Sequence, residues 1–215
     1  MRAPPPTQSL VIIAAGYALG GFALYWGLPE QATSWTASGR APFWLAPALA
    51  AFLLPTAMVI TNLLLRSLCL RHHGDDAGTM EVAIYDAIMR RFTAFVIGMH
   101  AMIMLGMLGW LSNRAWVAQI VPVMAGLTMI SIGNLLPRTR PNLAIGIRTR
   151  RTLSDRGLWI KTHRTAGYVL VLGGAVVVLS ALAIPTPAVP AMAVLLAPAA
   201  LVGSWFLRWS GKGDA

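Results

Sequence analysis

The stretch GYVLVLGGAVVVLSALAI, residues 167–184, contains no charged side chain in eighteen consecutive positions. A helix that crosses a hydrocarbon core of about 30 Å needs roughly 17–25 residues. Backbone polar groups in lipid must find partners within their own segment, which favours a helix. The stretch therefore predicts a transmembrane helix.

The rest of the chain has the same character. Of 215 residues, 57% are hydrophobic and 11% are charged, whereas a soluble domain usually has about 25% charged residues. Six apolar runs are long enough to span a membrane: 10–28, 42–65, 92–111, 116–136, 167–184 and 189–206. We therefore expect an all-α membrane protein, a bundle of six transmembrane helices. Five runs follow the first, so we expect an uncleaved anchor there and not a signal peptide.

Positive charge is distributed unevenly between the loops. Fifteen of the seventeen Lys and Arg residues fall on one side when loops are counted alternately, eight of them between residues 133 and 164. Only Arg40 and Arg114 fall on the other side. The positive-inside rule then predicts that both termini and the two long loops are cytoplasmic.

Tryptophan positions support the same orientation. Rings with one polar edge gather at both membrane interfaces. The pattern predicts an outer group of Trp26, Trp35, Trp44, Trp110 and Trp116, and an inner group of Trp159, Trp205 and Trp209.

The first cytoplasmic loop contains TMEVAIYDAIMRRF, residues 79–92, with apolar residues at helical spacing. This pattern predicts a short interfacial amphipathic helix on the inner leaflet before the third span. The alternative is a helix that packs on the other cytoplasmic loop, and the spacing alone does not separate the two.

Two polar features of the apolar region call for an explanation. His100 lies near the middle of the third run, where an imidazole is costly unless it is bonded, and Thr56 and Thr128 fall at similar depth. We expect a neutral histidine that ties helices together, with an intramembrane functional role as the alternative. Gly16 and Gly20 form a small-xxx-small pair that predicts close helix approach, within one chain or between two.

Signatures of catalysis are missing from the chain. We find no H-E-x-x-H, no G-x-S-x-G and no phosphate-binding glycine loop. The RHHGDD segment, residues 71–76, has adjacent potential ligands without a matching second pair, which favours a solvated loop over a metal site. We therefore expect no enzyme activity, no cofactor and no metal. The basic residues straddle the spans, so we also expect no direct nucleic acid binding.

The loop before residues 167–184 reads GNLLPRTRPNLAIGIRTRRTLSDRGLWIKTHR, residues 133–164, with eight cations and one acid. Prolines end the fourth helix, Gly146 permits a tight turn, and Thr152 with Asp155 has the spacing of a capping box. We therefore expect an ordered loop. Its cations would attract anionic lipid headgroups, at about 1 kcal/mol each.

These residues resemble the signature of the SdpI family of bacterial integral-membrane proteins. The family pattern is matched here by Gly133, Asn134, Pro137, Pro141, Asn142, Gly146, Ile147, Arg148, Thr149, Thr152, Leu153, Trp159, Thr162, His163, Arg164 and Gly167. Where the family usually has Pro-Trp after its Arg-Thr, this chain has Arg150 and Arg151. Residues 28–44 are similar to part of the DUF1648 domain, without its Ile-Pro-x-His segment.

The resemblance implies three regions: a DUF1648-like two-span region at 1–65, the cytoplasmic loop at 66–91, and an SdpI-like four-span region at 92–215. We name residues 133–167 the signature loop. The resemblance also implies a multi-pass protein of the bacterial cytoplasmic (inner) membrane, acting in immunity and signal transduction. Such a protein recognises a secreted toxic or signalling peptide and holds a transcriptional repressor at the membrane.

The residues implied for partner or ligand binding all lie in the signature loop: Asn134, Pro137, Asn142, Gly146, Arg148, Thr149, Thr152, Trp159, Thr162, His163 and Arg164. The alternative function is a small transporter or a protein that handles lipid headgroups, with His100 as an internal polar contact.

Overall fold

The computed structural model describes residues 7–27, 45–73, 79–111 and 114–183. Every regular element within these ranges is a helix. The elements are α1 (Thr7–Trp26), α2 (Leu45–His73), α3 (Thr79–Met107), α4 (Arg114–Gly133), η3 (Leu136–Arg138), α5 (Arg150–Ser154) and α6 (Arg156–Ala183).

Five of these helices are long and apolar enough to cross a membrane: Thr7–Trp26, Pro47–Cys69, Val82–Met107, Gln119–Arg138 and Arg156–Ala183. They match the first five predicted runs, while the sixth run, 189–206, lies outside the described residues. Large apolar side chains on the outer faces are exposed, among them Val11, Leu53, Leu63, Leu172 and Leu179. Because such surface is unfavourable in water, it identifies a multi-pass membrane protein.

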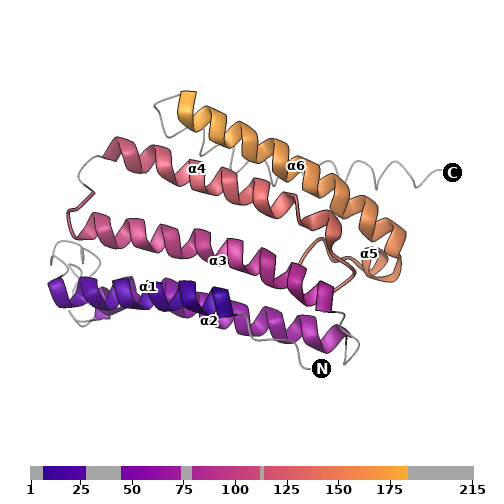
Figure 1. The fold of residues 1–215 in the computed structure, drawn as a ribbon, viewed down its shortest axis with the longest axis horizontal. Coiled ribbons are helices and arrows are strands. Elements are labelled where there is room, and N and C mark those ends of the chain that lie inside the picture. The colour runs from indigo at the N-terminus through magenta and orange to yellow at the C-terminus, as the bar shows by residue number, and fades with distance from the viewer. Residues whose placement is uncertain (1–6, 28–44, 74–78, 112–113, 184–215) are drawn as a thin grey trace.

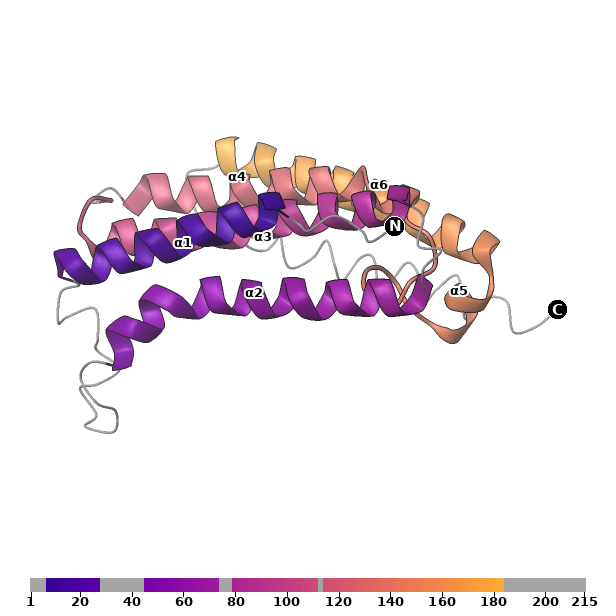
Figure 2. The same ribbon diagram turned by 60° about the horizontal axis from the view of Figure 1, so that its bottom comes forward.

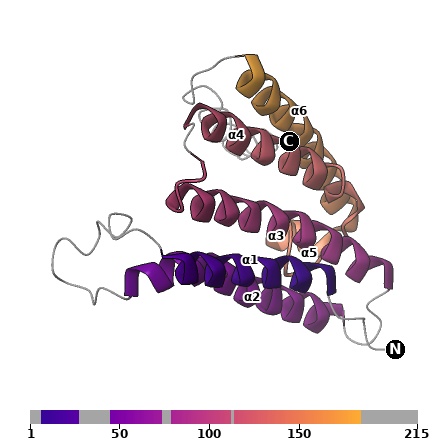
Figure 3. The same ribbon diagram turned by 60° about the vertical axis from the view of Figure 1, so that its left-hand side comes forward.

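The five long helices lie side by side in one bundle. Figure 1 places α3 between the α1–α2 pair and α4, with α6 outermost, and Figure 3 shows the same order from another side. Figure 2 shows α2 on one side of the layer that α1, α3, α4 and α6 form. One end of the bundle carries α5, the end of α2 and the start of α3 (Figure 1). We call it the basic end, because the cation-rich loops meet there.

Glycines of α1 allow this helix to approach α2 and α3. A methyl group at Gly16 would lie 3.0 Å from Ile97 of α3, and one at Gly20 would collide with the carbonyl of Ala51 of α2. Pro55 has no N–H for the Ala51 carbonyl, so that group is the one α2 leaves open. The small-xxx-small pair therefore works within one chain.

Two further glycine pairs bring α4 and α6 into backbone contact. A Cβ at Gly126 would lie 2.7 Å from the carbonyl oxygen of Gly174, and one at Gly133 would lie 2.8 Å from that of Gly167. The pairs are seven residues apart on each helix, so they lie on one face of it. Close packing of this kind is a principal source of helix association in lipid.

Polar contacts tie α2 to α3 toward the basic end. Arg66 of α2 forms an ion pair with Asp86 of α3 at 2.7 Å. One turn inward from Arg66, Asn62 Nδ2 donates to Thr93 Oγ1 at 3.1 Å. These bonds hold α2 against α3 where the chain leaves the apolar region.

Residues 79–92 are helical, but they are not the separate interfacial helix that the pattern predicted. They form the first half of α3, which runs without interruption from Thr79 to Met107. Tyr85 and Met89 belong to a buried cluster that also contains Ala144 of the signature loop, and Ile145 packs against it. Packing against the signature loop is the alternative prediction, which helical spacing alone could not distinguish from an interfacial helix. Apolar residues at helical spacing can face protein as readily as lipid.

Two of the five tryptophans predicted for the outer group, Trp26 and Trp110, lie together at the opposite end, while Trp35 and Trp44 lie outside the described residues. The rings of Trp26 and Trp110 lie 6.4 Å apart, each near Phe22, and both are exposed. Trp159 corrects the prediction for the inner group, because its side chain is 0% exposed. It is part of the interior of the signature loop and not of an aromatic belt.

His100 of α3 is fully buried. Its ring faces the backbone of Gly16, and neither ring nitrogen has a hydrogen-bond partner. Thr56 instead pairs with Tyr17 at 2.7 Å, and Thr128 donates to its own helix at Met124. Neither threonine therefore provides the contact that depth alone had suggested.

Candidate functional site

The signature loop begins where α4 ends at the basic end of the bundle. Pro137 stands in the first turn of η3, where a residue without an N–H costs no hydrogen bond. Its ring also packs on α6, since a Cβ at Gly167 would lie 3.0 Å from Pro137 Cγ. Asn134 is exposed at the end of α4. These contacts fix the start of the loop.

Asn142 organises the turn that follows. Its Oδ1 accepts hydrogen bonds from the backbone N–H groups of Ala144 at 2.9 Å and Ile145 at 2.7 Å. Its Nδ2 donates to the carbonyl of Arg140 at 2.8 Å. The side chain thus takes the place of backbone partners in a tight turn, and it is buried in doing so.

His163 joins this loop to the first turns of α6. Its Nε2 lies 3.1 Å from the backbone nitrogen of Ile147, and its Nδ1 lies 2.9 Å from the carbonyl oxygen of Trp159. The Ile147 N–H can only donate, so Nε2 accepts; the carbonyl can only accept, so Nδ1 carries the proton. The two bonds therefore specify a neutral imidazole in one tautomer.

Gly146 provides the room for this contact. Its φ is +114°, a region that favours glycine, and a Cβ there would collide with His163 Nε2. The predicted tight turn is therefore present, and its second requirement is the imidazole that lies against it.

The indole of Trp159 lies beneath this histidine. The two rings stack with centroids 3.8 Å apart and planes 16° from parallel. Trp159 Nε1 donates to the carbonyl of Thr139 at 3.0 Å, so its one polar group is satisfied within the protein. Nothing in the sequence pairs residue 139 with residue 159. A turn and a helix brought together by the fold make this contact.

The capping box lies three residues before the predicted position. Thr149, not Thr152, caps the short helix α5: its side chain accepts from the Thr152 N–H at 3.1 Å, and Thr152 Oγ1 accepts from the Thr149 N–H at 2.8 Å. Asp155 then accepts from the N–H groups of Gly157 and Leu158 at the start of α6. Thr152 thus completes the capping box of α5, and Asp155 caps α6 separately.

Most of the signature loop lies within a match to a known protein family. Residues 138–210 match the family model described as the SdpI/YfhL protein family. This match supports the SdpI family assignment that the signature predicted, over residues 138–210 of the 215-residue chain. The match does not include residues 28–44, whose likeness to DUF1648 stays a prediction. Searches of curated proteins and of solved structures found no match to this chain.

The residues of the SdpI signature divide by exposure. Trp159, His163, Thr152 and Asn142 are buried; Pro137, Thr149 and Thr162 are half-buried. Asn134, Gly146, Arg148 and Arg164 are exposed. The buried members bond to one another or to the backbone and shape the loop. A direct contact with a partner is therefore open chiefly to the exposed members.

All eight cations between residues 133 and 164 are exposed: Arg138, Arg140, Arg148, Arg150, Arg151, Arg156, Lys161 and Arg164. Arg148 also donates to the carbonyl of Leu143, which orders its stem. The signature loop is thus held in place by internal hydrogen bonds and has a cationic surface. Its chemistry suits anionic groups.

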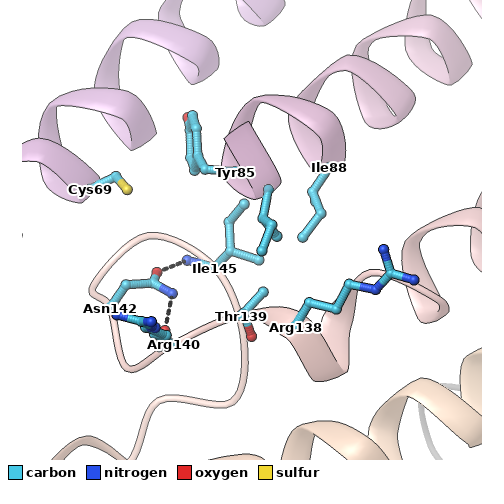
Figure 4. A pocket seen from close by; sticks show the side chains of 9 residues that line it. Cys69, Tyr85, Ile88, Arg138, Thr139, Arg140, Asn142 and Ile145 are labelled. Atoms are coloured by element: carbon cyan, nitrogen blue, oxygen red, sulfur yellow. Dashed lines mark hydrogen bonds between the residues drawn. The ribbon is translucent and has the colours of Figure 1, made fainter. Parts of the chain in front are cut away.

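A small pocket opens between the signature loop and the helices α2 and α3. Cys69 of α2, Tyr85 of α3, and Thr139, Arg140 and Asn142 of the loop contribute to its lining (Figure 4). Its volume of about 20 Å³ is on the order of one or two water molecules. In this state the pocket is too small for an organic ligand. No group of three or more potential metal ligands occurs among the described residues.

Proposed function

We propose that this SdpI-family protein acts in the bacterial inner membrane by recognition and not by catalysis. It recognises a toxic or signalling peptide, and its signature loop engages a cytoplasmic partner. One observation carries the second part: eight exposed cations stand on a loop whose backbone is held by buried side chains. Recognition of the peptide is assigned to residues 28–44, which lie outside the described part of the chain.

A rigid loop favours binding because little conformational entropy is lost when the partner docks. The bonds of Asn142, Thr149, Thr152 and His163 already fix the backbone that presents the arginines. A merely topological loop needs positive charge but no such framework. The framework therefore supports a binding role.

The outer face of α6 indicates where lipid contact begins. Arg156, Ile160, Arg164 and Tyr168 follow one another every fourth residue and are all exposed. Beyond Tyr168 the exposed face is apolar, at Leu172, Val176 and Leu179. We place the headgroup level between Arg164 and Tyr168, since arginine and tyrosine favour that depth.

This placement separates the cations by their distance from lipid. Arg156 lies twelve residues before Tyr168, which is about 18 Å along a helix. Arg150 and Arg151 belong to α5, which lies beside the start of α6 (Figure 1). At physiological salt, charges interact over about 8 Å. The arginines of α5 are therefore offered to a soluble partner, and an acidic protein surface has the complementary charge.

The test removes the positive charges of the loop arginines while the hydrogen-bonded backbone of the loop is kept. Arg148, Arg150 and Arg151 are changed together to Gln, and Arg164→Gln is the single-site control at the headgroup level. Membrane insertion and thermal stability are measured, together with survival of the host on antimicrobial peptides and recovery of cytoplasmic proteins cross-linked to the loop. We expect the triple variant to insert and melt normally but to lose its cross-linked partner and peptide resistance. Normal resistance and cross-linking in that variant would reject the proposal.

Handling of lipid headgroups is the second candidate, favoured by the exposed Arg164 one turn from the apolar face of α6. Reconstituted vesicles separate it from recognition. Movement of a labelled anionic lipid between leaflets, dependent on Arg164, supports headgroup handling. No such movement, with partner capture intact, supports recognition.

A further inference from the structure

A half-buried arginine lies in the groove between α3 and α4. Arg91 of α3 donates through Nε to the hydroxyl of Ser131 on α4, and through Nη1 to the carbonyl of Ala87 at 2.8 Å. Both acceptors are uncharged, so neither balances the charge of the guanidinium. Arg66 and Asp86, by contrast, form a direct ion pair on α2 and α3.

A second arginine reaches the same groove. Ile84, Ile88 and Arg91 are separated by four and three residues, so they share one face of α3. Arg138 lines a pocket together with Ile84 and Ile88. Its guanidinium is turned away from Asn142 and lies on the Ile88 side (Figure 4). Arg91 and Arg138 therefore both lie along this face of α3.

We propose that Arg91, Arg138 and the Ser131 hydroxyl bind the phosphate group of an anionic phospholipid. The planar guanidinium group matches phosphate oxygens with two parallel hydrogen bonds. Basic sites between transmembrane helices on the cytoplasmic side commonly take anionic headgroups. Neither Arg91 nor Ser131 belongs to the signature loop, although Arg138 is one of its eight exposed cations. The site does not depend on peptide recognition.

The position of the groove selects a lipid over free phosphate. Arg91 and Ser131 belong to the apolar segments Val82–Met107 and Gln119–Arg138. Leu127 precedes Ser131 by one turn on the same face of α4 and is 54% exposed. A ligand that reaches the arginines along this face therefore meets apolar surface, which an acyl chain can cover and an inorganic ion cannot.

The experiment measures lipid binding by the full chain purified in detergent. Its melting temperature is followed as phosphatidylglycerol, phosphatidylcholine or inorganic phosphate is added, and native mass spectrometry counts retained lipids. We expect phosphatidylglycerol to raise the melting temperature and to remain bound, with little effect of the other two. Equal effects of the two lipids, or an equal effect of inorganic phosphate, would overturn the assignment.

Matched variants locate the site. Arg91→Gln and Arg138→Gln should each weaken apparent affinity for phosphatidylglycerol about tenfold, the usual scale for a lost charged hydrogen bond. Arg90→Gln removes the same charge from the neighbouring residue, which binds Gln8 of α1, and should leave affinity unchanged. Similar losses in Arg90→Gln and Arg91→Gln would overturn the site.

Folding of the variants is controlled separately. Melting in phosphatidylcholine gives each variant's own baseline, and Arg91→Lys keeps the charge while losing the planar fork. We expect Arg91→Lys to bind phosphatidylglycerol more tightly than Arg91→Gln. Binding by Arg91→Lys no tighter than that by Arg91→Gln would contradict a phosphate contact at this residue.

Discussion

His163 Nε2 accepts a hydrogen bond from the backbone N–H of Ile147 at 3.1 Å, across sixteen residues of chain. With the bond from Nδ1 to the Trp159 carbonyl, it makes this side chain one of the connections between the signature loop and α6. The histidine of the SdpI signature thus has a structural role, which its position in a basic loop does not indicate.

Replacing His163 with Ala should destabilise the protein by roughly 2–4 kcal/mol. The substitution leaves the Ile147 N–H without its partner and removes the ring stacked on Trp159. Thermal unfolding in detergent measures the effect. Arg164→Ala, one residue later and exposed, is the control and should change stability by less than about 0.5 kcal/mol. Equal melting of the two variants would show that the histidine does not hold the loop.

Gly146→Ala should lower stability by about 2 kcal/mol or more, because strained backbone and a steric collision act together. The residue has φ of +114°, and its new Cβ would meet His163 Nε2. Gly106→Ala is the matched change, since a Cβ there meets nothing within 4 Å. The melting temperatures of the pair decide the matter, and a stable Gly146→Ala protein would contradict the observed turn.

Trp159→Phe should cost about 1–2 kcal/mol, since it removes the N–H that binds the Thr139 carbonyl and keeps an aromatic ring beneath His163. Trp110→Phe, at an exposed ring of the opposite end, controls for loss of an indole. Unfolding monitored by circular dichroism compares the two. If Trp110→Phe is the more damaging, Trp159 is not the anchor described here.

Gly126→Leu should separate α4 from α6 and destabilise the bundle by about 1–3 kcal/mol. A Cβ at this position would lie 2.7 Å from the Gly174 carbonyl oxygen. Gly21→Leu on α1, where a Cβ meets nothing within 4 Å, is the control. Cross-linking of cysteines placed across the α4–α6 interface, together with melting, reports the separation. Unchanged cross-linking in Gly126→Leu would show that the helices do not pack through this pair.

Local patterns in the sequence predicted much of the fold. The five described spans, the glycine approach of α1, the turn at Gly146 and the convergence of Trp26 with Trp110 all follow from hydrophobicity, turn chemistry and interface preference. The prediction for the start of α6 named the right residue types in the wrong arrangement. Thr149 and Thr152 form the capping box of α5, and Asp155 caps α6 by itself. Both arrangements share one spacing, and only backbone geometry distinguishes them.

The sequence by itself determined the solvent of this protein: runs of apolar residues with charge confined to their ends require lipid, whatever the helices touch. Only the tertiary structure decided which signature residues are buried. Trp159 meets Thr139, and His163 meets Ile147, because α6 packs back against the turn that precedes it. Such partners are sixteen and twenty residues apart. Periodicity reports which solvent or neighbour a face prefers, but it does not report which distant backbone group will lie within hydrogen-bonding distance.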